Sequence, residues 1–251
     1  MIWCLHGAVG MAADWNELAE KWSRSEHTVT QLDLWRFLSS GGVSLEEFGR
    51  ALNEEVRENG DGEKNILVGY SMGGRLGLHA LLAEPELWSA AVIVSAHPGL
   101  RTEEERLRRM AHDAEWAGKA LTADWTKFVE EWSGQDVLKA VAKESEMELQ
   151  GFADRSSLES QRQAVARSFM EWSLGKQEEL CPRFSEIACP VLWVTGDRDE
   201  KFSDLAKEVV CELPHGEHVM IEGGGHRVPW EEMEAFADLV GEWVAKGEAG
   251  S

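Results

Sequence analysis

Short apolar segments alternate with longer amphipathic ones over the first third of the chain and again over its last quarter. The apolar segments are rich in Val, Ile and Leu, and several are apolar throughout instead of alternating with polar residues. Such segments are typical of parallel strands that are buried on both faces. We predict strands at Ile2–Leu5, Thr28–Leu32, Ile66–Val68, Ala91–Ser95, Val191–Thr195 and His218–Ile221.

The segments between these strands have the apolar spacing of amphipathic helices. A regular alternation of strands and helices is typical of a doubly wound α/β protein. We therefore predict a mainly parallel sheet of about six strands with helices on both faces. Because the chain begins directly at the first strand, we expect no antiparallel pair at the edge of the sheet. The predicted helices are Ala13–Ser23, Ser44–Glu58, Met72–Leu82, Ser203–Cys211 and Trp230–Lys246.

The alternation stops over residues 98–182, which have no strand-like segment. This stretch combines mixed charge with apolar periodicity, as in the long pattern Ser157–Leu174, and is almost wholly helical in character. Cys189-Pro190 then begins the next strand. We predict an α/β core formed by residues 1–97 and 183–251, with residues 98–182 inserted as a helical lid.

Composition narrows the class of partner. The 251 residues carry a formal net charge of −21, which argues against nucleic acid or an anionic membrane surface as a partner. The start of the chain lacks the pattern of a signal peptide, and no apolar run of about 18 residues predicts a membrane span. We expect a cytoplasmic monomer or small homo-oligomer that has no cofactor and keeps its thiols free. We also expect no metal site, because no metal-ligand spacing joins the four cysteines. These are Cys4, Cys181, Cys189 and Cys211.

The motif Gly69-Tyr70-Ser71-Met72-Gly73 carries the first chemical signal. It lies between a predicted strand and a predicted helix, the context of the nucleophile elbow of α/β-hydrolases. Glycines permit the unusual backbone angles of this turn and the close passage of strand and helix. Ser71 is therefore the candidate nucleophile or base, exposed beside the first amides of the helix.

A serine of this kind needs a base and an orienting carboxylate. In α/β-hydrolases these follow the serine in the order acid, then histidine. Asp199 ends one predicted strand and His226 follows the last one, so both should meet Ser71 at the carboxyl edge of the sheet. Asp197 is the alternative acid, although it lies nearer the strand and can instead bond its own turn.

Two further histidines compete with His226. His215 precedes the last predicted strand and His218 begins it, so both belong to the opposite edge of the sheet and are predicted to be surface residues. The glycines before His226 form a flexible loop that can bring its ring to the serine.

An oxyanion hole requires two backbone donors. The amide of Met72 is one candidate, and the amide of Ala8, in the loop after the first strand, is the other. His6 opens this loop, and we expect it to brace the loop through its side chain and not to act in catalysis.

The start of the lid is rich in arginine. Most of these side chains fit a solvated helix face with partners four residues away, such as Glu105 for Arg109. One that faces inward could bind a carboxylate in bidentate fashion. Trp132, at the end of a lid helix, could line the mouth of a pocket. The arginines are Arg101, Arg106, Arg108 and Arg109.

Several of these motifs together resemble the MenH family, the 2-succinyl-6-hydroxy-2,4-cyclohexadiene-1-carboxylate synthases of the menaquinone pathway. The elbow alone is general to α/β-hydrolases, whereas the tyrosine before the serine, the Gly-Gly-Arg and the His-Pro-Gly-Leu are more particular. The resemblance covers most of the chain. It rests on the run Val68–Leu76, Ala96–Leu100, Glu105-Arg106 with Arg109, Asp113 and Trp116, and Gly196–Phe202.

The resemblance implies a lyase that eliminates pyruvate, without water, from 2-succinyl-5-enolpyruvyl-6-hydroxy-3-cyclohexene-1-carboxylate. Ser71, activated by His226, would take a proton α to a carbonyl, and the oxyanion hole would hold the enolate charge. The resemblance also supports Asp199 as the acid. It further implies a small anionic substrate bound by Tyr70, Arg109, Trp132 and Arg155, with Arg162 as a rival of Arg155.

The chain departs from the family in places. The loop after the second strand reads Asp33-Leu34-Trp35-Arg36 where members have Asp-Leu-Pro-Gly, and Ala8 replaces a bulkier residue. Two alternatives therefore stay open: a carboxylesterase-type hydrolase of small acyl substrates with the same triad, and a binding module without activity. The complete Ser-Asp-His set argues against the second.

Overall fold

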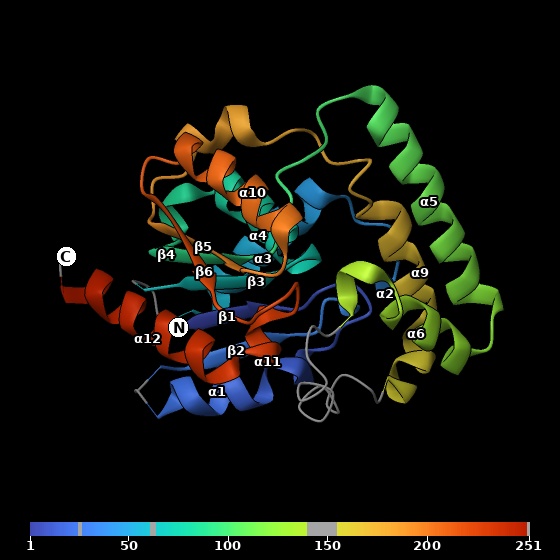
Figure 1. Ribbon diagram of the computed structural model, residues 1–251, viewed down its shortest axis with the longest axis horizontal. Helices are drawn as coiled ribbons and strands as arrows, with labels where there is room; N and C mark the ends of the chain where they lie inside the picture. The colour runs from blue at the N-terminus through green and yellow to red at the C-terminus, as the bar shows by residue number, and fades with distance from the viewer. Residues whose placement is uncertain (25–26, 61–63, 140–154, 250–251) are drawn as a thin grey trace.

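The computed structural model describes residues 1–24, 27–60, 64–139 and 155–249. Its centre is a sheet of six parallel strands in the order β2-β1-β3-β4-β5-β6 (Figure 1). The described strands include no antiparallel pair, so the predicted α/β fold and strand count are confirmed. The strands are β1 (Ile2–Leu5), β2 (Val29–Leu32), β3 (Ile66–Tyr70), β4 (Ala90–Val94), β5 (Val191–Gly196) and β6 (Gly216–Ile221).

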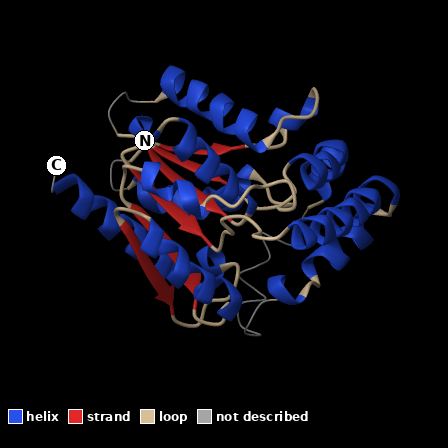
Figure 2. Cartoon of the chain, turned by 90° about the horizontal axis from the view of Figure 1, so that it is seen from above, coloured by secondary structure: helices blue, strands red, loops and turns tan. Residues whose placement is uncertain are grey.

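Helices cover both faces of the sheet (Figure 2). The face with α3 and α4 also carries α10, and α1 and α12 pack together on the opposite face. The larger helices are α1 (Asn16–Ser23), α3 (Leu45–Asn59), α4 (Met72–Ala83), α5 (Glu103–Thr122), α6 (Trp125–Ser133), α9 (Arg162–Glu171), α10 (Glu200–Val209) and α12 (Met233–Ala249). The shortest are α2 (Arg36–Ser39) and α11 (Val228–Glu231), with 3-10 turns η1 (Ala12–Trp15), η2 (Pro85–Leu87), η3 (Asp136–Leu138), η4 (Ser156–Gln161), η5 (Cys181–Glu186) and η6 (Val210–Glu212).

Burial on both faces explains why the inner strands β1, β3, β4 and β5 are apolar at almost every position. In β1, Trp3 and Leu5 belong to the core under α3 and α4, whereas Ile2 and Cys4 belong to the core under α1 and α12. All four are almost completely buried. Successive side chains of a strand point to opposite faces, so a strand between two helical layers needs apolar residues at every position.

Some predicted boundaries were wrong by a few residues. The helix expected at Ser203 begins at Glu200, because Asp199 stands at its N-cap position and its carbonyl accepts from the Ser203 amide at 2.9 Å. The helix expected from Trp230 is two helices, α11 and α12, since the chain leaves helical geometry at Glu232.

Residues 98–182, which we call the lid, contain no strand among those described. Its main helices are α5, α6 and α9, and they lie beside the carboxyl edge of the sheet (Figure 1). The Thr102 hydroxyl and the Glu105 carboxylate form a capping box at the start of α5. The boundaries of core and lid stay a prediction. Among the described helices, none is long and apolar enough to cross a membrane.

Candidate active site

The turn that holds Ser71 requires glycine on either side. Ser71 has φ 51° between β3 and α4, a left-handed conformation that is strained for residues other than glycine. A Cβ at Gly73 would lie 2.3 Å from the Leu5 carbonyl oxygen, and one at Gly69 would lie 2.7 Å from the Gly74 Cα. The close passage of α4 over β1 and β3 therefore excludes any side chain at these two positions.

Asp199, His226 and Ser71 are joined by two consecutive hydrogen bonds. The Asp199 Oδ2 is 2.7 Å from the His226 Nδ1, and the His226 Nε2 is 3.3 Å from the Ser71 Oγ. A carboxylate can only accept, so Nδ1 carries the ring proton and Nε2 is left to accept from the serine hydroxyl. Asp199 and His226 are both buried. The three side chains are arranged as a nucleophile or base, its proton acceptor and an orienting carboxylate.

Asp199 lies in the loop after β5 and His226 in the loop after β6. Contacts between these two loops position both side chains. The Arg198 amide donates to the Gly224 carbonyl at 3.0 Å, and a Cβ at Gly196 would lie 2.0 Å from that same oxygen. The Glu231 carboxylate accepts from the Gly225 amide at 2.5 Å. The loop before His226 is therefore clamped between the end of β5 and α11.

Asp197 lies in the same turn but faces another partner. Its carboxylate accepts from the Gly223 amide at 2.9 Å. The structure thus pairs His226 with Asp199. Asp197 bonds the neighbouring loop and not its own turn, so the partner expected for Asp197 was wrong.

The competing histidines do not reach Ser71. His215 is exposed ahead of β6. His218 was expected at the surface, and this was wrong: it is half-buried within β6, and its Nε2 lies 2.8 Å from the Thr195 hydroxyl on β5. Strand β6 begins two residues earlier than predicted, at Gly216, so His218 lies inside the strand and not at its first position.

The predicted oxyanion donors flank the serine. Ala8 and Met72 both line the pocket that holds Ser71, and Met72 is the first residue of α4. The first amides of a helix have no partner within the helix and can bind an anion. The loop containing Ala8 follows β1, next to β3 in the sheet, so both amides come from neighbouring strand ends.

His6 braces this loop, as expected. The Leu34 amide donates to its Nε2 at 3.2 Å, so Nδ1 carries the proton and donates to the Gly7 carbonyl at 2.8 Å. Complete burial lowers the pKa of His6 to about 3, which keeps the ring neutral. The Trp35 indole donates to the Gly10 carbonyl at 2.9 Å. The unusual loop after β2 therefore supports the oxyanion loop, a contact that sequence analysis missed.

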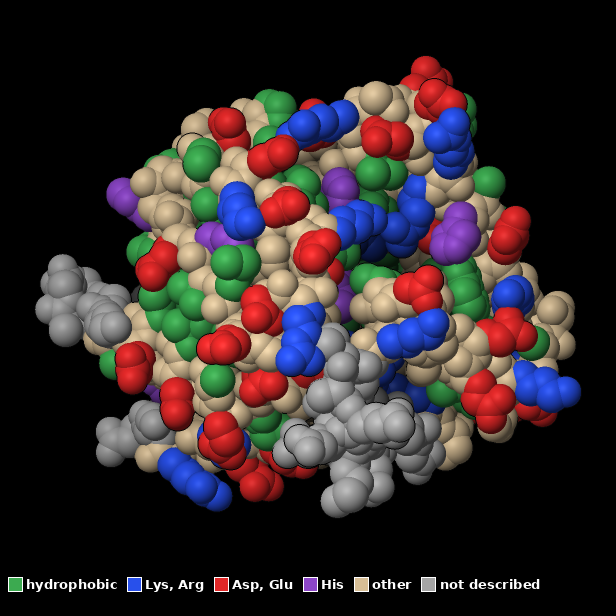
Figure 3. Space-filling view, viewed as in Figure 1, with side chains coloured by type: hydrophobic (Ala, Val, Ile, Leu, Met, Phe, Trp, Pro, Cys, Tyr) green, Lys and Arg blue, Asp and Glu red, His purple; other side chains and the backbone are tan. Residues whose placement is uncertain are grey.

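A pocket of about 210 Å³ opens above Ser71, between the carboxyl edge of the sheet and the lid. Arg75, Arg109 and Lys201 line it, and Asp113 is the only carboxylate among the described residues that line it. Lys and Arg side chains gather beside the hollow between the two parts of the molecule (Figure 3). The pocket is thus locally cationic in a strongly acidic chain. Its other main lining residues are Ala8, Met72, Ser95, His97, His112, Trp132, Gln135, Leu174, Phe202 and His226.

Sequence analysis did not assign Arg75 a role. Its guanidinium donates to the Gln177 side-chain oxygen at 3.0 Å and to the Trp172 carbonyl at 2.7 Å. Burial and the nearby Arg109 lower the pKa of Arg75 to about 9, which leaves it cationic at neutral pH. The available signal was its spacing, since a residue four positions after Ser71 shares that face of α4.

Arg109 faces the pocket, but its expected partner was wrong. Its Nε donates to the Asp113 Oδ1 at 2.8 Å, whereas Glu105 caps the start of α5. The second Asp113 oxygen accepts from the Ser173 hydroxyl at 2.7 Å. Asp113 therefore fixes the Arg109 side chain through one nitrogen. Arg101 and Arg108 are exposed and pair with glutamates outside the pocket, as expected of a solvated face.

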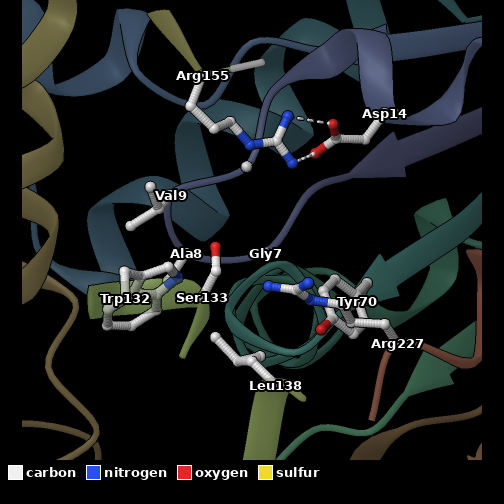
Figure 4. Close-up of a pocket in the computed structure, with 11 residues that line it drawn as sticks. Gly7, Ala8, Val9, Asp14, Tyr70, Trp132, Ser133, Leu138, Arg155 and Arg227 are labelled. Atoms are coloured by element: carbon white, nitrogen blue, oxygen red, sulfur yellow. Dashed lines mark hydrogen bonds and ion pairs between the residues drawn. The ribbon is translucent and has the colours of Figure 1, made fainter. Parts of the chain in front are cut away.

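Arg155 and Tyr70 line a smaller neighbouring pocket, which shares Ala8 and Trp132 with the pocket above Ser71 (Figure 4). The Arg155 guanidinium points toward the Asp14 carboxylate and binds it through two nitrogens, at 2.6 and 3.1 Å. Both side chains are buried. The structure thus gives Arg155 a structural partner, and substrate binding by Arg155 stays a prediction.

Tyr70 lines the smaller pocket, and Trp132 lines both pockets. The Tyr70 ring lies 5.6 Å from the His226 ring and packs edge-on against Trp230. Trp132 contacts Trp116 and Phe169 of the lid. The rival Arg162 lines neither of these two pockets, and it donates to the Ala120 and Ala123 carbonyls at the C-terminal end of α5.

The fold and this site define an α/β-hydrolase. The model of the alpha/beta hydrolase family matches residues 4–239, and the chain belongs to that family. Within it, the chain is 28% identical over 241 residues to the 2-succinyl-6-hydroxy-2,4-cyclohexadiene-1-carboxylate synthase of Pectobacterium atrosepticum, covering 94% of this chain and 90% of the relative. The resemblance to the MenH family is thereby confirmed.

Solved structures agree on the fold. MenH from S. aureus superposes with a TM-score of 0.85 at 21% identity, over 98% of this chain and 94% of that one. A thermophilic esterase from Thermogutta terrifontis gives 0.77 at 17% identity, over 98% and 89%. The same scaffold therefore carries proteins named for different chemistries.

Proposed function

We propose that the protein is a lyase of menaquinone biosynthesis that eliminates pyruvate from 2-succinyl-5-enolpyruvyl-6-hydroxy-3-cyclohexene-1-carboxylate. The observation that carries the proposal is the cationic lining around Ser71. Arg75 and Arg109 line the same pocket as Ser71 and His226, and a substrate with several carboxylates needs such partners in an acidic protein. The synthase names of the relatives support the same reaction.

Ser71 is proposed as the base. In this mechanism its Oγ takes the proton from ring carbon 2, which is α to the succinyl ketone, while the hydroxyl proton passes to the His226 Nε2. The 3.3 Å separation suits a transfer that tightens when substrate binds. Asp199 holds the ring and stabilises the imidazolium that forms.

The electron flow then balances without water. The C–H electron pair forms the C2–C3 double bond, the C3–C4 double bond moves to C4–C5, and the C5–O bond breaks. The ketone oxygen carries enolate charge during this step, facing the amides proposed as the oxyanion hole, Ala8 and Met72. The His226 proton goes to the departing enolpyruvate, which becomes pyruvate. No acyl-enzyme forms.

Carboxylester hydrolysis is the competing activity, because the same triad would perform it covalently. The test measures pyruvate release from the enolpyruvyl substrate and turnover of p-nitrophenyl acetate by the same preparation. We expect kcat/KM to be larger for pyruvate release by several orders of magnitude, since the cationic pocket offers a neutral ester no matching contact. Brisk ester turnover without pyruvate release would establish the esterase instead.

A further inference from the structure

Ser95 is a second serine at the same edge of the sheet. Tyr70 pairs with Val94 in the register of β3 and β4, so Ser71 and Ser95 follow at the matching ends of neighbouring parallel strands. Ser95 also has a positive φ, 46°, close to the 51° of Ser71. Backbone strain of this kind persists where the surrounding structure enforces it and is concentrated at functional sites.

The Ser95 hydroxyl has no hydrogen-bond partner among the described residues, although it is completely buried. Buried hydroxyls are almost always paired, and an unpaired one is costly. Ser95 lines the pocket together with Ser71 and His226. Ser95 is therefore a pocket-lining residue whose buried hydroxyl lacks a partner among the described residues.

His97, two residues further on, offers a second uncharged donor. The Gly99 amide donates to its Nδ1 at 3.1 Å, so the neutral ring carries its proton on Nε2. Burial, together with Lys201, Arg75 and Arg109, lowers the pKa of His97 to about 4 and keeps the ring neutral. His97 also lines the pocket, and no described residue binds its Nε2.

The remaining polar groups of the pocket are mainly cations and donors, so the ligand that completes Ser95 must be rich in acceptors. We propose that the segment after β4 forms the uncharged part of a carboxylate-binding subsite. In this subsite the Ser95 Oγ and the His97 Nε2 donate hydrogen bonds to a carboxylate of the bound substrate or of released pyruvate. The proposal rests on the anionic substrate of the proposed function and adds two specificity-determining residues to it.

The test uses pyruvate as the probe and Ser95→Ala as the variant. We expect the Kd for pyruvate, measured by calorimetry, to rise about tenfold through loss of a hydrogen bond to a charged group. The Tm without ligand should stay unchanged or rise, because an unpaired buried hydroxyl has been removed.

Ser168→Ala is the matched control. Ser168 is equally buried, but its hydroxyl donates to the Val165 carbonyl within α9 and it does not line the pocket. This variant should leave the Kd for pyruvate unchanged and should not raise the Tm. If Ser95→Ala does not fold, Ser95→Gly replaces it, because glycine accepts the positive φ.

Equal pyruvate affinity in wild type and the Ser95 variant would overturn the proposal. So would a wild type that binds no pyruvate, or a lowered Tm with unchanged affinity, which would assign the hydroxyl to the fold. Failure of the proposed lyase reaction is a separate result, because the pyruvate measurement does not depend on turnover.

Discussion

At the scale of single residues, the geometry around His226 separates two aspartates that are only two positions apart. Asp199 contacts the ring at 2.7 Å, whereas Asp197 binds the Gly223 amide. We predict that Asp199→Asn lowers kcat for pyruvate release roughly a hundred- to ten-thousandfold, because an amide no longer fixes the tautomer that accepts from Ser71. Asp197→Asn retains an acceptor for Gly223 and should change kcat only a few-fold. Greater damage from Asp197→Asn would contradict the assignment.

A second prediction at the scale of single residues concerns the positive charge of Arg109. A hydrogen-bonded contact between arginine and carboxylate is worth about 1.5–3 kcal/mol. Arg109→Ala should therefore lower kcat/KM for pyruvate release roughly ten- to a hundredfold and change p-nitrophenyl acetate turnover little. Arg108→Ala is the control, since that side chain is exposed and pairs with Glu104. Equal losses of Arg109→Ala on charged and neutral substrates would mean that Arg109 only holds the lid together.

At the scale of elements, the Arg155–Asp14 pair joins the lid to the segment after the oxyanion loop. The Asp14 carboxylate also accepts from the Met11 amide at 2.9 Å, and the Arg155 carbonyl accepts from the Trp125 indole at 2.7 Å. Removing one partner of a buried ion pair leaves the other charge uncompensated, at a cost of about 3–5 kcal/mol. Arg155→Ala should therefore lower the free energy of unfolding by about that amount, as measured by urea denaturation.

The double variant Arg155→Met/Asp14→Leu is the control for this prediction. It removes both charges and should recover most of the lost stability. If Arg155→Ala left stability unchanged and reduced activity only on the charged substrate, Arg155 would serve the substrate alone.

The elements that could be predicted from sequence are those set by local pattern. Strands buried on both faces are visible as unbroken apolar runs, and α3 begins after Ser44 because its hydroxyl accepts from the Glu47 amide. The elbow was predictable for the same reason, since its glycines and serine are neighbours in the chain. Ser71, Asp199 and His226 followed from the order of elements.

The sequence alone did not determine which of two equally spaced partners a side chain binds. Glu105 and Asp113 are both four residues from Arg109, and only the burial of that helix face against Ser173 selects Asp113. The brace of Trp35 on the Gly10 carbonyl joins loops that are far apart in the chain. Such contacts depend on tertiary packing, which no local pattern encodes.

At the scale of the whole molecule, buried histidines make the protein sensitive to acid. Burial lowers the pKa of His6 to about 3 and those of His79 and His97 to about 4. The pKa of unfolded histidine is about 6.5, so below that pH the unfolded state binds protons that the folded state does not. The contribution of these neutral histidines to the free energy of unfolding is therefore complete above about pH 6.5. It decreases as the pH falls toward about 4, by about 1.4 kcal/mol per pH unit for each histidine.

His79→Leu isolates one of these contributions. His79 lies on α4, away from the pocket, and its Nε2 is buried without a described partner. We expect the slope of unfolding free energy against pH, between 6 and 4.5, to decrease by about 1.4 kcal/mol per unit relative to wild type. An unchanged slope would mean that His79 is already protonated in the folded protein.

The central claim is that the Ser71–His226 pair removes a proton and expels enolpyruvate without water. The most direct measurement follows pyruvate and the conjugated cyclohexadiene together during turnover of the enolpyruvyl substrate. We predict that both appear at the same rate, one for one, and that Ser71→Ala abolishes both. Pyruvate released without the diene would mean that water replaces the leaving group, and it would contradict the elimination mechanism.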